Sequence, residues 1–169
     1  MSSTSSAKTL LADLGGTNVR FALADPALPQ PLLLDSVRRY RVKDFPSMAD
    51  TIRQYFADSG LSAGRAVIAA AGRIVDGETV KVTNNPWQVS AHGLAADLKF
   101  DSVRLINDFA AQGMAVPLLA CNELQPVGAP QPPKIGAHHS QTFVVVGPGT
   151  GLGVAGLLLR DGRWTVLET

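Results

Sequence analysis

The stretch Leu10–Leu23, with the sequence LLADLGGTNVRFAL, contains the turn around which the rest of the chain is organised. An apolar run ends at Asp13, a pair of glycines follows, and a second apolar run begins at Val19. Two short apolar runs that flank a glycine pair are typical of a β-hairpin. The sequence therefore predicts two antiparallel strands joined by a tight turn at Gly15 and Gly16.

The residues of this turn are also suited to binding a phosphorylated ligand. Glycines lack the side chains that keep a ligand away from the backbone, so their amides are free to point at an anion. Thr17 and Asn18 add a hydroxyl and an amide, and the Asp13 carboxylate can hold a cation directly or through water. Two interpretations stay open from this stretch alone: a cradle for nucleotide phosphates and their Mg²⁺, or a plain hairpin with an incidental acidic residue.

Composition indicates an ordinary globular protein. The 169 residues are 46% hydrophobic and 17% charged, with a net charge of +1. This length allows one full core, or one domain and part of another. The near-neutral charge gives no sign of nucleic-acid binding or of electrostatic membrane attachment. Cys121 is the single cysteine, so an internal disulfide is excluded and a buried thiol is expected.

The N-terminal segment, residues 1–7, is polar and is predicted to be disordered. It lacks the basic residues and the apolar core of a secretory signal. No apolar run approaches the roughly 18 residues that span a membrane. We therefore expect a soluble, cytoplasmic protein that binds neither membranes nor nucleic acid.

The pattern beyond the first hairpin predicts a mixed α/β fold. A third strand is expected over 32–42, and a helix follows, capped by Ser47 and ended by Gly60. Further strands are expected over 65–71 and 103–106, and another helix is expected to stop at Pro117. Three adjacent strands followed by helices favour a mixed sheet with an antiparallel start, flanked by helices.

Three regions follow from this pattern. Residues 8–118 are predicted to form an N-terminal α/β lobe. Residues 119–141 are rich in proline and lack periodicity, which indicates a linker or a surface loop. Residues 142–169 are predicted to form the first hairpin of a second lobe, with a turn at Asp161–Gly162.

A second glycine cluster, GPGTGLG over 147–153, enters this last hairpin. It does not fit the dinucleotide pattern G-x-G-x-x-G, because Leu152 stands at the closing position and a strand is expected to follow. The chain also has no Gly-Lys-Ser or Gly-Lys-Thr of a Walker A loop. What remains is a strand, a Gly/Thr turn and a strand, as in the first hairpin. Two such turns suggest a nucleotide held between paired loops.

Asn107 and Asp108 follow an apolar strand directly and precede a helix. Ligands of α/β sheets bind at the carboxyl ends of the strands. An aspartate there can accept a proton from a substrate hydroxyl that the neighbouring amide orients. For the isolated dipeptide, an N-cap of the following helix is the alternative interpretation.

Four motifs in order make the chain resemble the bacterial glucokinases. They are DLGGTNVR at 13–20, TNNPW at 83–87, LINDF at 105–109 and GTGLG at 149–153. The resemblance runs from about Lys8 to Glu168. It implies an actin-like ATPase fold, with a ribonuclease-H-like sheet in each of two lobes. It also implies ATP-dependent phosphorylation of the 6-hydroxyl of D-glucose, and a homodimer for the full-length protein.

The resemblance also implies roles for individual residues. Asp108 would be the general base, Asn107 and Asn84 would contact the sugar together with Asp108, and Asp13 would act near Mg²⁺ indirectly. The expected ATP-binding residues are Ala12, Asp13, Leu14, Gly15, Gly16, Thr17 and Asn18 in the first loop, and Gly149, Thr150 and Gly151 in the second.

The chain departs from that family in length. Family members continue with a Glu-Gly-Gly-His motif that binds the sugar, whereas this sequence stops at Thr169. We therefore expect an N-terminal portion of a glucokinase that is inactive by itself. The alternatives are a kinase for another sugar or amino sugar, and a non-catalytic sugar or nucleotide sensor of the same fold.

Overall fold

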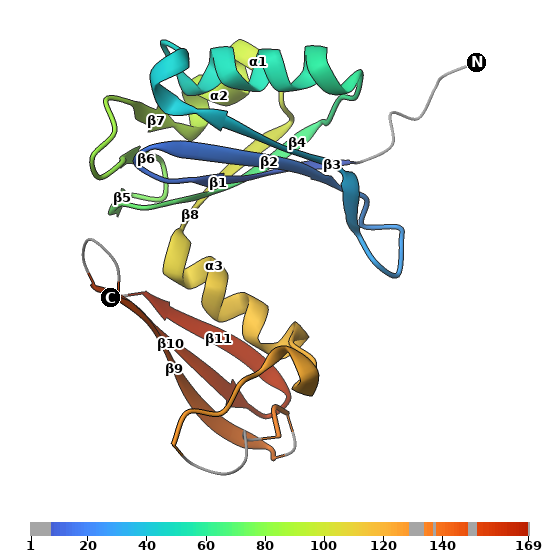
Figure 1. Ribbon diagram of the computed structural model, residues 1–169, viewed down its shortest axis with the longest axis vertical. Coiled ribbons are helices and arrows are strands. Elements are labelled where there is room, and N and C mark those ends of the chain that lie inside the picture. The colour runs from blue at the N-terminus through green and yellow to red at the C-terminus, as the bar shows by residue number, and fades with distance from the viewer. Residues whose placement is uncertain (1–7, 129–133, 137, 149–151, 169) are drawn as a thin grey trace. The chain divides into compact units, whose positions relative to one another are not determined.

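Five strands pair into the main sheet of the computed structural model, which describes residues 8–128, 134–136, 138–148 and 152–168 (Figure 1). In chain order the strands are β1 (Thr9–Leu14), β2 (Asn18–Ala24), β3 (Leu32–Arg41), β4 (Arg65–Ala70) and β8 (Ser102–Asn107). Their order across the sheet is β3-β2-β1-β4-β8. The pairs β1–β2 and β2–β3 are antiparallel, whereas β1–β4 and β4–β8 are parallel. The predicted mixed sheet with an antiparallel start is confirmed.

Two helices, α1 (Met48–Ser59) and α2 (Ala91–Leu98), cover one face of this sheet (Figure 1). The hydroxyl of Ser47 accepts a hydrogen bond from the Asp50 amide at 3.1 Å, and Gly60 ends α1 at φ +66°. This is the predicted cap at each end of the helix. None of the helices in the described ranges is both long and apolar enough to cross a membrane.

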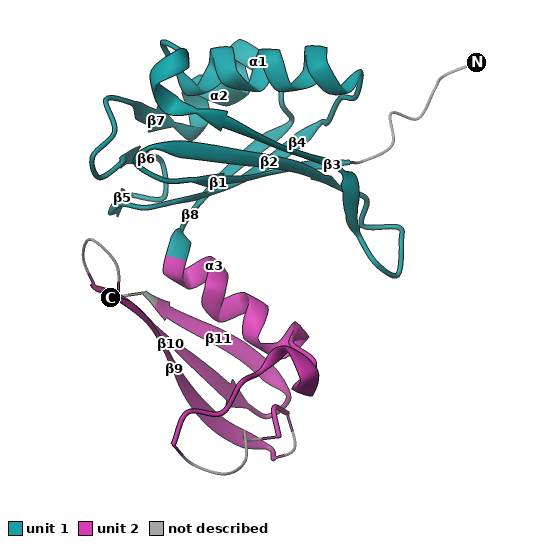
Figure 2. Cartoon of the chain, viewed as in Figure 1, with its two compact units in different colours: residues 1–108 teal, residues 109–169 magenta. Residues whose placement is uncertain are grey.

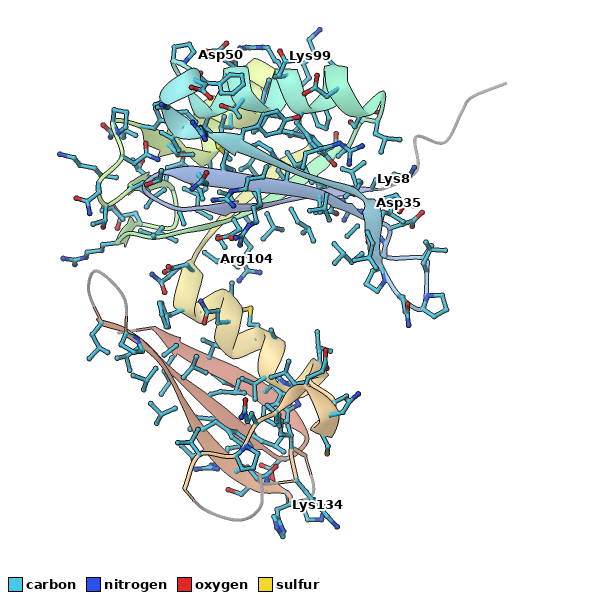
Figure 3. All side chains as sticks on the ribbon, viewed as in Figure 1. Lys8, Asp35, Asp50, Lys99, Arg104 and Lys134 are labelled. Atoms are coloured by element: carbon cyan, nitrogen blue, oxygen red, sulfur yellow. The ribbon has the colours of Figure 1, made fainter. Side chains whose placement is uncertain are left out.

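Side chains alternate between the two faces of the sheet, as the period of a strand requires. In β1, Leu10 and Leu14 are buried in the core under the helices, whereas Asp13 is exposed. In β8, Leu105 is buried and Arg104 is exposed. Figure 3 shows Arg104 on the side of the sheet opposite the helices. Asp13, like Arg104, therefore lies on the face of the sheet that the helices leave uncovered.

A small second sheet lies next to the ends of the central strands. It consists of β5 (Ile74–Val75), β6 (Thr79–Lys81) and β7 (Gln88–Ser90), in that order. The Ala71 amide donates to the Leu14 carbonyl at 3.0 Å, and the Thr83 amide donates to the Ala71 carbonyl at 2.9 Å. These two bonds attach the segment after β6 to the ends of β1 and β4.

Glu78 in this region supports the start of α2. Its carboxylate accepts hydrogen bonds from the His92 amide at 2.6 Å and from the Ser90 hydroxyl at 2.9 Å. These two bonds lower the pKa of Glu78 below its usual value of 4.5, and the bond from the His92 amide has the larger effect. The charged form is therefore favoured in the folded protein, and the stabilisation is present at neutral pH and lost as the pH falls through the lowered pKa.

Replacing Glu78 with glutamine is accordingly expected to lower the urea midpoint at pH 7. The difference from wild type should shrink at pH values below 4, because the wild-type carboxylate is then protonated as well. Urea unfolding at the two pH values measures this. Asp35→Asn, at an exposed position of β3, serves as the control. A deficit that is equal at both pH values would contradict this role of the charge.

The second unit begins at Phe109 and contains the remaining elements (Figure 2). Its helical elements are α3 (Asp108–Ala115), apart from its first residue, and the short 3-10 helices η2 (Val116–Leu118) and η3 (Cys121–Glu123). The first unit also has a short 3-10 helix, η1 (Val42–Asp44). Its sheet consists of β9 (Ser140–Pro148), β10 (Leu152–Arg160) and β11 (Arg163–Glu168), in the order β11-β10-β9. Pro117 lies in η2, directly after α3, as predicted.

The chain divides into two compact units between Asp108 and Phe109. The reason is that α3 packs on the second sheet: a methyl group at Gly113 would lie 3.5 Å from the Val166 side chain. Cys121 is exposed, so the expectation of a buried thiol is wrong. Its apolar neighbours Leu118 and Leu119 are exposed as well, so no core surrounds it.

Phe109 explains the outer two glycines of the second cluster. Gly147 and Gly153 are register partners in β9 and β10. A methyl group at either position would overlap the ring of Phe109. Gly147 and Gly153 therefore leave room for an aromatic side chain, which is a packing role that the sequence did not reveal.

Replacing Gly153 with alanine is expected to destabilise the second unit by about 1–3 kcal/mol, because the ring or the strand must move. Gly156→Ala in the same strand is the matched control, since its methyl group would lie 3.5 Å from the nearest Leu167 atom, an ordinary contact. Chemical unfolding of both variants measures the difference. Equal effects at the two positions would contradict the packing role of Phe109.

Candidate functional site

The carboxyl ends of three neighbouring parallel strands lie in register. Leu14 of β1 pairs with Ala70 of β4, and Ala70 pairs with Asn107 of β8. Two strand spacings separate Leu14 from Asn107, a distance of about 10 Å. The turn that follows β1 and the Asn107–Asp108 pair at the end of β8 therefore belong to the same edge of one sheet. Such an edge is where α/β sheets bind ligands.

The turn between β1 and β2 is closed by a hydrogen bond from the Gly15 amide to the Asn18 carbonyl at 3.0 Å. A methyl group at Gly16 would lie 2.8 Å from the Thr83 carbonyl oxygen and 3.2 Å from that of Asn84. Only glycine fits at this position without a shift of the backbone. Among the residues that the structure describes, the Gly16 amide has no acceptor. It is a free donor of the kind that binds phosphate oxygens.

Asn85 ties this turn to the 83–87 segment. Its side-chain amide donates from Nδ2 to the Gly15 carbonyl at 3.0 Å, and its Oδ1 accepts from the Trp87 amide at 2.8 Å. Asn85 is only 8% exposed, and Trp87 beside it is buried in the core. Asn85 lies in the TNNPW motif, but its contact with Gly15 could not be predicted, because 70 positions separate the two residues. Asn84, which the resemblance implied as a sugar contact, is exposed with φ +56°.

The Asp13 carboxylate accepts a hydrogen bond from the Arg20 guanidinium at 3.2 Å. The two side chains are 57% and 60% exposed, so this pair is weak and the carboxylate is open to solvent. The pairing is a consequence of the hairpin, since Asp13 and Arg20 are register partners. The closing hydrogen bond sets this register: with Gly15 opposite Asn18, Leu14 pairs with Val19 and Asp13 pairs with Arg20. On the same face, the Arg39 guanidinium donates to Asn18 Oδ1 at 3.1 Å.

Asn107 and Asp108 stand where the sequence predicted, at the end of β8. The Asn107 side-chain amide donates to the Gly72 carbonyl at 3.4 Å. Gly72 itself cannot carry a side chain, because a methyl group would lie 2.5 Å from the Lys81 carbonyl oxygen. Asp108 is partly exposed and is the first residue of α3. This position fits both a general base at the sheet edge and the helix-end role that the dipeptide allowed.

The other expected site residues divide into two groups. Ala12 and Leu14 are buried in the sheet, so only their backbone can serve a ligand. Thr17 is exposed at the tip of the turn, and its carbonyl accepts from the Val42 amide at 2.9 Å. Gly149, Thr150 and Gly151 lie outside the described residues. In the described ranges, no three histidine, cysteine, aspartate or glutamate side chains gather into a metal-binding group.

Known proteins are similar to this chain in sequence and in architecture. The family model described as Glucokinase matches residues 10–169. A glucokinase of Stenotrophomonas maltophilia (strain R551-3) is 50% identical over 99% of the chain, which corresponds to 50% of that protein. The chain thus spans about half the length of the curated relatives it matches.

Two solved structures share the fold, a mixed α/β fold of the actin-like ATPase type. The glucokinase of an Antarctic psychrotroph has a TM-score of 0.78 at 33% identity, covering 96% of this chain and 50% of its own. The glucokinase of Balamuthia mandrillaris, solved in complex with glucose, has a TM-score of 0.66 at 27% identity, covering 100% of this chain and 49% of its own. The family match over nearly the whole chain leads to one conclusion: the chain belongs to the glucokinase family.

Proposed function

We propose that these residues form the N-terminal part of an ATP-dependent glucokinase, which transfers the γ-phosphoryl group of ATP to the 6-hydroxyl of D-glucose. The observation that carries the proposal is the shared sheet edge, where a glycine turn with a free amide stands two strands from Asn107 and Asp108. The family match supports the choice of reaction and substrate.

In this reaction the oxygen of the glucose 6-hydroxyl attacks the γ-phosphorus of ATP. The bond between that phosphorus and the oxygen that bridges it to the β-phosphate breaks, and ADP and glucose 6-phosphate result. Asp108 accepts the proton of the hydroxyl, and Asn107 and Asn84 orient the sugar. Phosphoryl transfer depends mainly on alignment and charge stabilisation, so one base and well-placed donors are what the protein must supply.

The turn at 15–17 fits the phosphates of ATP, since a side chain at Gly16 would close the approach and the Gly16 amide is free to donate. The exposed Asp13 carboxylate is a hard oxygen ligand that suits Mg²⁺, directly or through a water molecule. When bound, Mg²⁺ would neutralise charge on the phosphates. Gly149–Gly151 would supply the second phosphate loop, as the resemblance implies.

The remaining expectations belong to the same proposal. The full-length protein would be a cytoplasmic homodimer, with residues 8–118 in the first lobe, 119–141 as a linker or loop and 142–169 opening the second. Light scattering on the full-length protein would measure the oligomeric state. The chain of 169 residues would turn over glucose poorly, because half a cleft cannot position both substrates or exclude water.

A coupled assay on the full-length protein tests the function. Glucose, fructose, mannose and N-acetyl sugars are each supplied with Mg²⁺ and ATP, and ADP formation is followed. Preferred turnover of glucose is the expected result. Absence of turnover with every sugar would overturn the kinase assignment, and preference for another sugar would overturn the substrate. Robust turnover by residues 1–169 alone would contradict the expected inactivity of the shorter chain.

A further inference from the structure

We infer that Asn85 is a positioning residue that aims the Gly16 amide at the phosphates, an inference that rests on the proposed function. The starting point is its burial. Asn85 is one of three buried polar residues among those described, with Ser36 and Thr51. A buried amide is costly unless its donor and acceptor are both paired. Asn85 pairs both, one with each of two segments that the sheet edge brings together.

The two partners determine which way the Asn85 amide faces. The Gly15 carbonyl can only accept a hydrogen bond, so the Nδ2 group must face it. The Trp87 backbone amide can only donate, so Oδ1 must face that amide. The 83–87 segment is itself fixed, since Trp87 is 5% exposed and the Thr83 amide is bonded to the Ala71 carbonyl. Asn85 is therefore itself fixed in place, and its hydrogen bond fixes the orientation of the Gly15 carbonyl.

A fixed Gly15 carbonyl also fixes the next amide. The peptide bond between Gly15 and Gly16 is planar and trans, so its carbonyl and its N–H point in opposite directions. Asn85 draws the carbonyl toward the 83–87 segment, and the Gly16 N–H must then point away from it. Glycine rotates about its backbone bonds more freely than any other residue, so this turn needs an outside anchor to keep one peptide orientation.

Loss of the hydrogen bond from Asn85 to Gly15 is expected to raise the KM for ATP specifically, whereas a general loss of stability would not. Asn85→Asp in the full-length protein keeps the acceptor for the Trp87 amide but removes the donor to the Gly15 carbonyl. We expect the KM for ATP to rise about tenfold or more and kcat to fall, because misplacement of a positioning group by about 1 Å costs about 10²-fold in rate. The KM for glucose should stay within about twofold, since the bond that shapes the 83–87 segment is retained.

Two further variants distinguish the loss of the Asn85–Gly15 hydrogen bond from the effect of an added charge and from a loss of stability. Asn85→Ala removes both hydrogen bonds without adding a charge, and should raise the KM values for ATP and for glucose together. Ser36→Ala is the matched control: Ser36 is also buried in the same unit, and its hydroxyl accepts a hydrogen bond from the Leu23 amide at 2.8 Å. It should lower the Tm and leave the KM for ATP unchanged. An Asn85→Asp enzyme with wild-type ATP kinetics, or a Ser36→Ala enzyme with the same rise in KM, would overturn the inference.

Amide hydrogen exchange on the wild-type full-length protein tests the geometry if the Asn85 variants do not fold. Without nucleotide, the Trp87 amide should exchange slowly and the Gly16 amide rapidly, because only the first has an acceptor. Rapid exchange at Trp87, or slow exchange at Gly16, would refute the anchor. A wild-type protein that phosphorylates no sugar would instead refute the proposed function, and would leave this exchange pattern as a separate test.

Discussion

Replacing Asp108 with asparagine in the full-length protein is expected to lower kcat for glucose phosphorylation by about 10²–10⁴-fold, the usual contribution of a general base. Asparagine has almost the same shape as aspartate and can still orient the sugar hydroxyl, but it cannot take up the proton. The KM for ATP should change little, because Asp108 stands at the end of β8 and the phosphate turn follows β1. Initial rates at saturating ATP and glucose measure the effect.

Asp76→Asn provides the control for this substitution. Asp76 lies in the turn between β5 and β6 with φ +52°, a conformation that asparagine also adopts readily. Its replacement should leave kcat within about twofold of wild type. If Asp108→Asn retained full turnover, Asp108 would act only at the helix end, and the base would have to be sought elsewhere. If the variant lost turnover but kept ligand binding, the kinase interpretation would be favoured over a sensor.

Replacing Gly16 with alanine is expected to lower kcat/KM for ATP by about 10²-fold or more, since a displacement of the order of 1 Å at a positioning group has that effect. The added methyl group would lie 2.8 Å from the Thr83 carbonyl oxygen, which is backbone and has no room to move aside as a flexible side chain would. The turn must shift away from the 83–87 segment, and the free amide shifts with it. Steady-state kinetics with varied ATP measure the loss.

Gly15→Ala is the matched comparison for this variant. A methyl group at Gly15 would lie 3.6 Å from the Asn18 carbonyl oxygen, which is ordinary van der Waals contact. We therefore expect a clearly smaller effect at Gly15 than at Gly16, both on kcat/KM for ATP and on thermal stability. Equal losses at both glycines would mean that the turn needs flexibility rather than close approach to the neighbouring loop.

The hairpin at 10–23 and the capped helix at 48–59 could be predicted from the sequence because their signals are local. Alternation of apolar residues sets the faces of a strand, and Ser47 and Gly60 mark the ends of the helix through bonds within a few residues. The pairing of Asp13 with Arg20 is equally local, but it follows from the bond between Gly15 and Asn18, which only the structure shows.

Local signals also misled in places. Cys121 was expected to be buried because cysteine usually is, yet its surroundings along the chain are exposed. Nothing in the spacing of Gly147 and Gly153 indicated that they leave room for the ring of Phe109. In the second case the answer depended on a residue about 40 positions away along the chain, which composition and spacing do not reveal.

By itself, the sequence determined the first hairpin, the helix capped by Ser47 and Gly60, and the position of Asn107–Asp108 after a strand. The tertiary structure alone decided that the ends of β1, β4 and β8 share one register, and that Asn85 meets Gly15 across 70 residues. The physical reason is the separation along the chain of the residues that interact. Turns and caps are set by hydrogen bonds between near neighbours, whereas contacts between distant segments form only when a buried core brings those segments together.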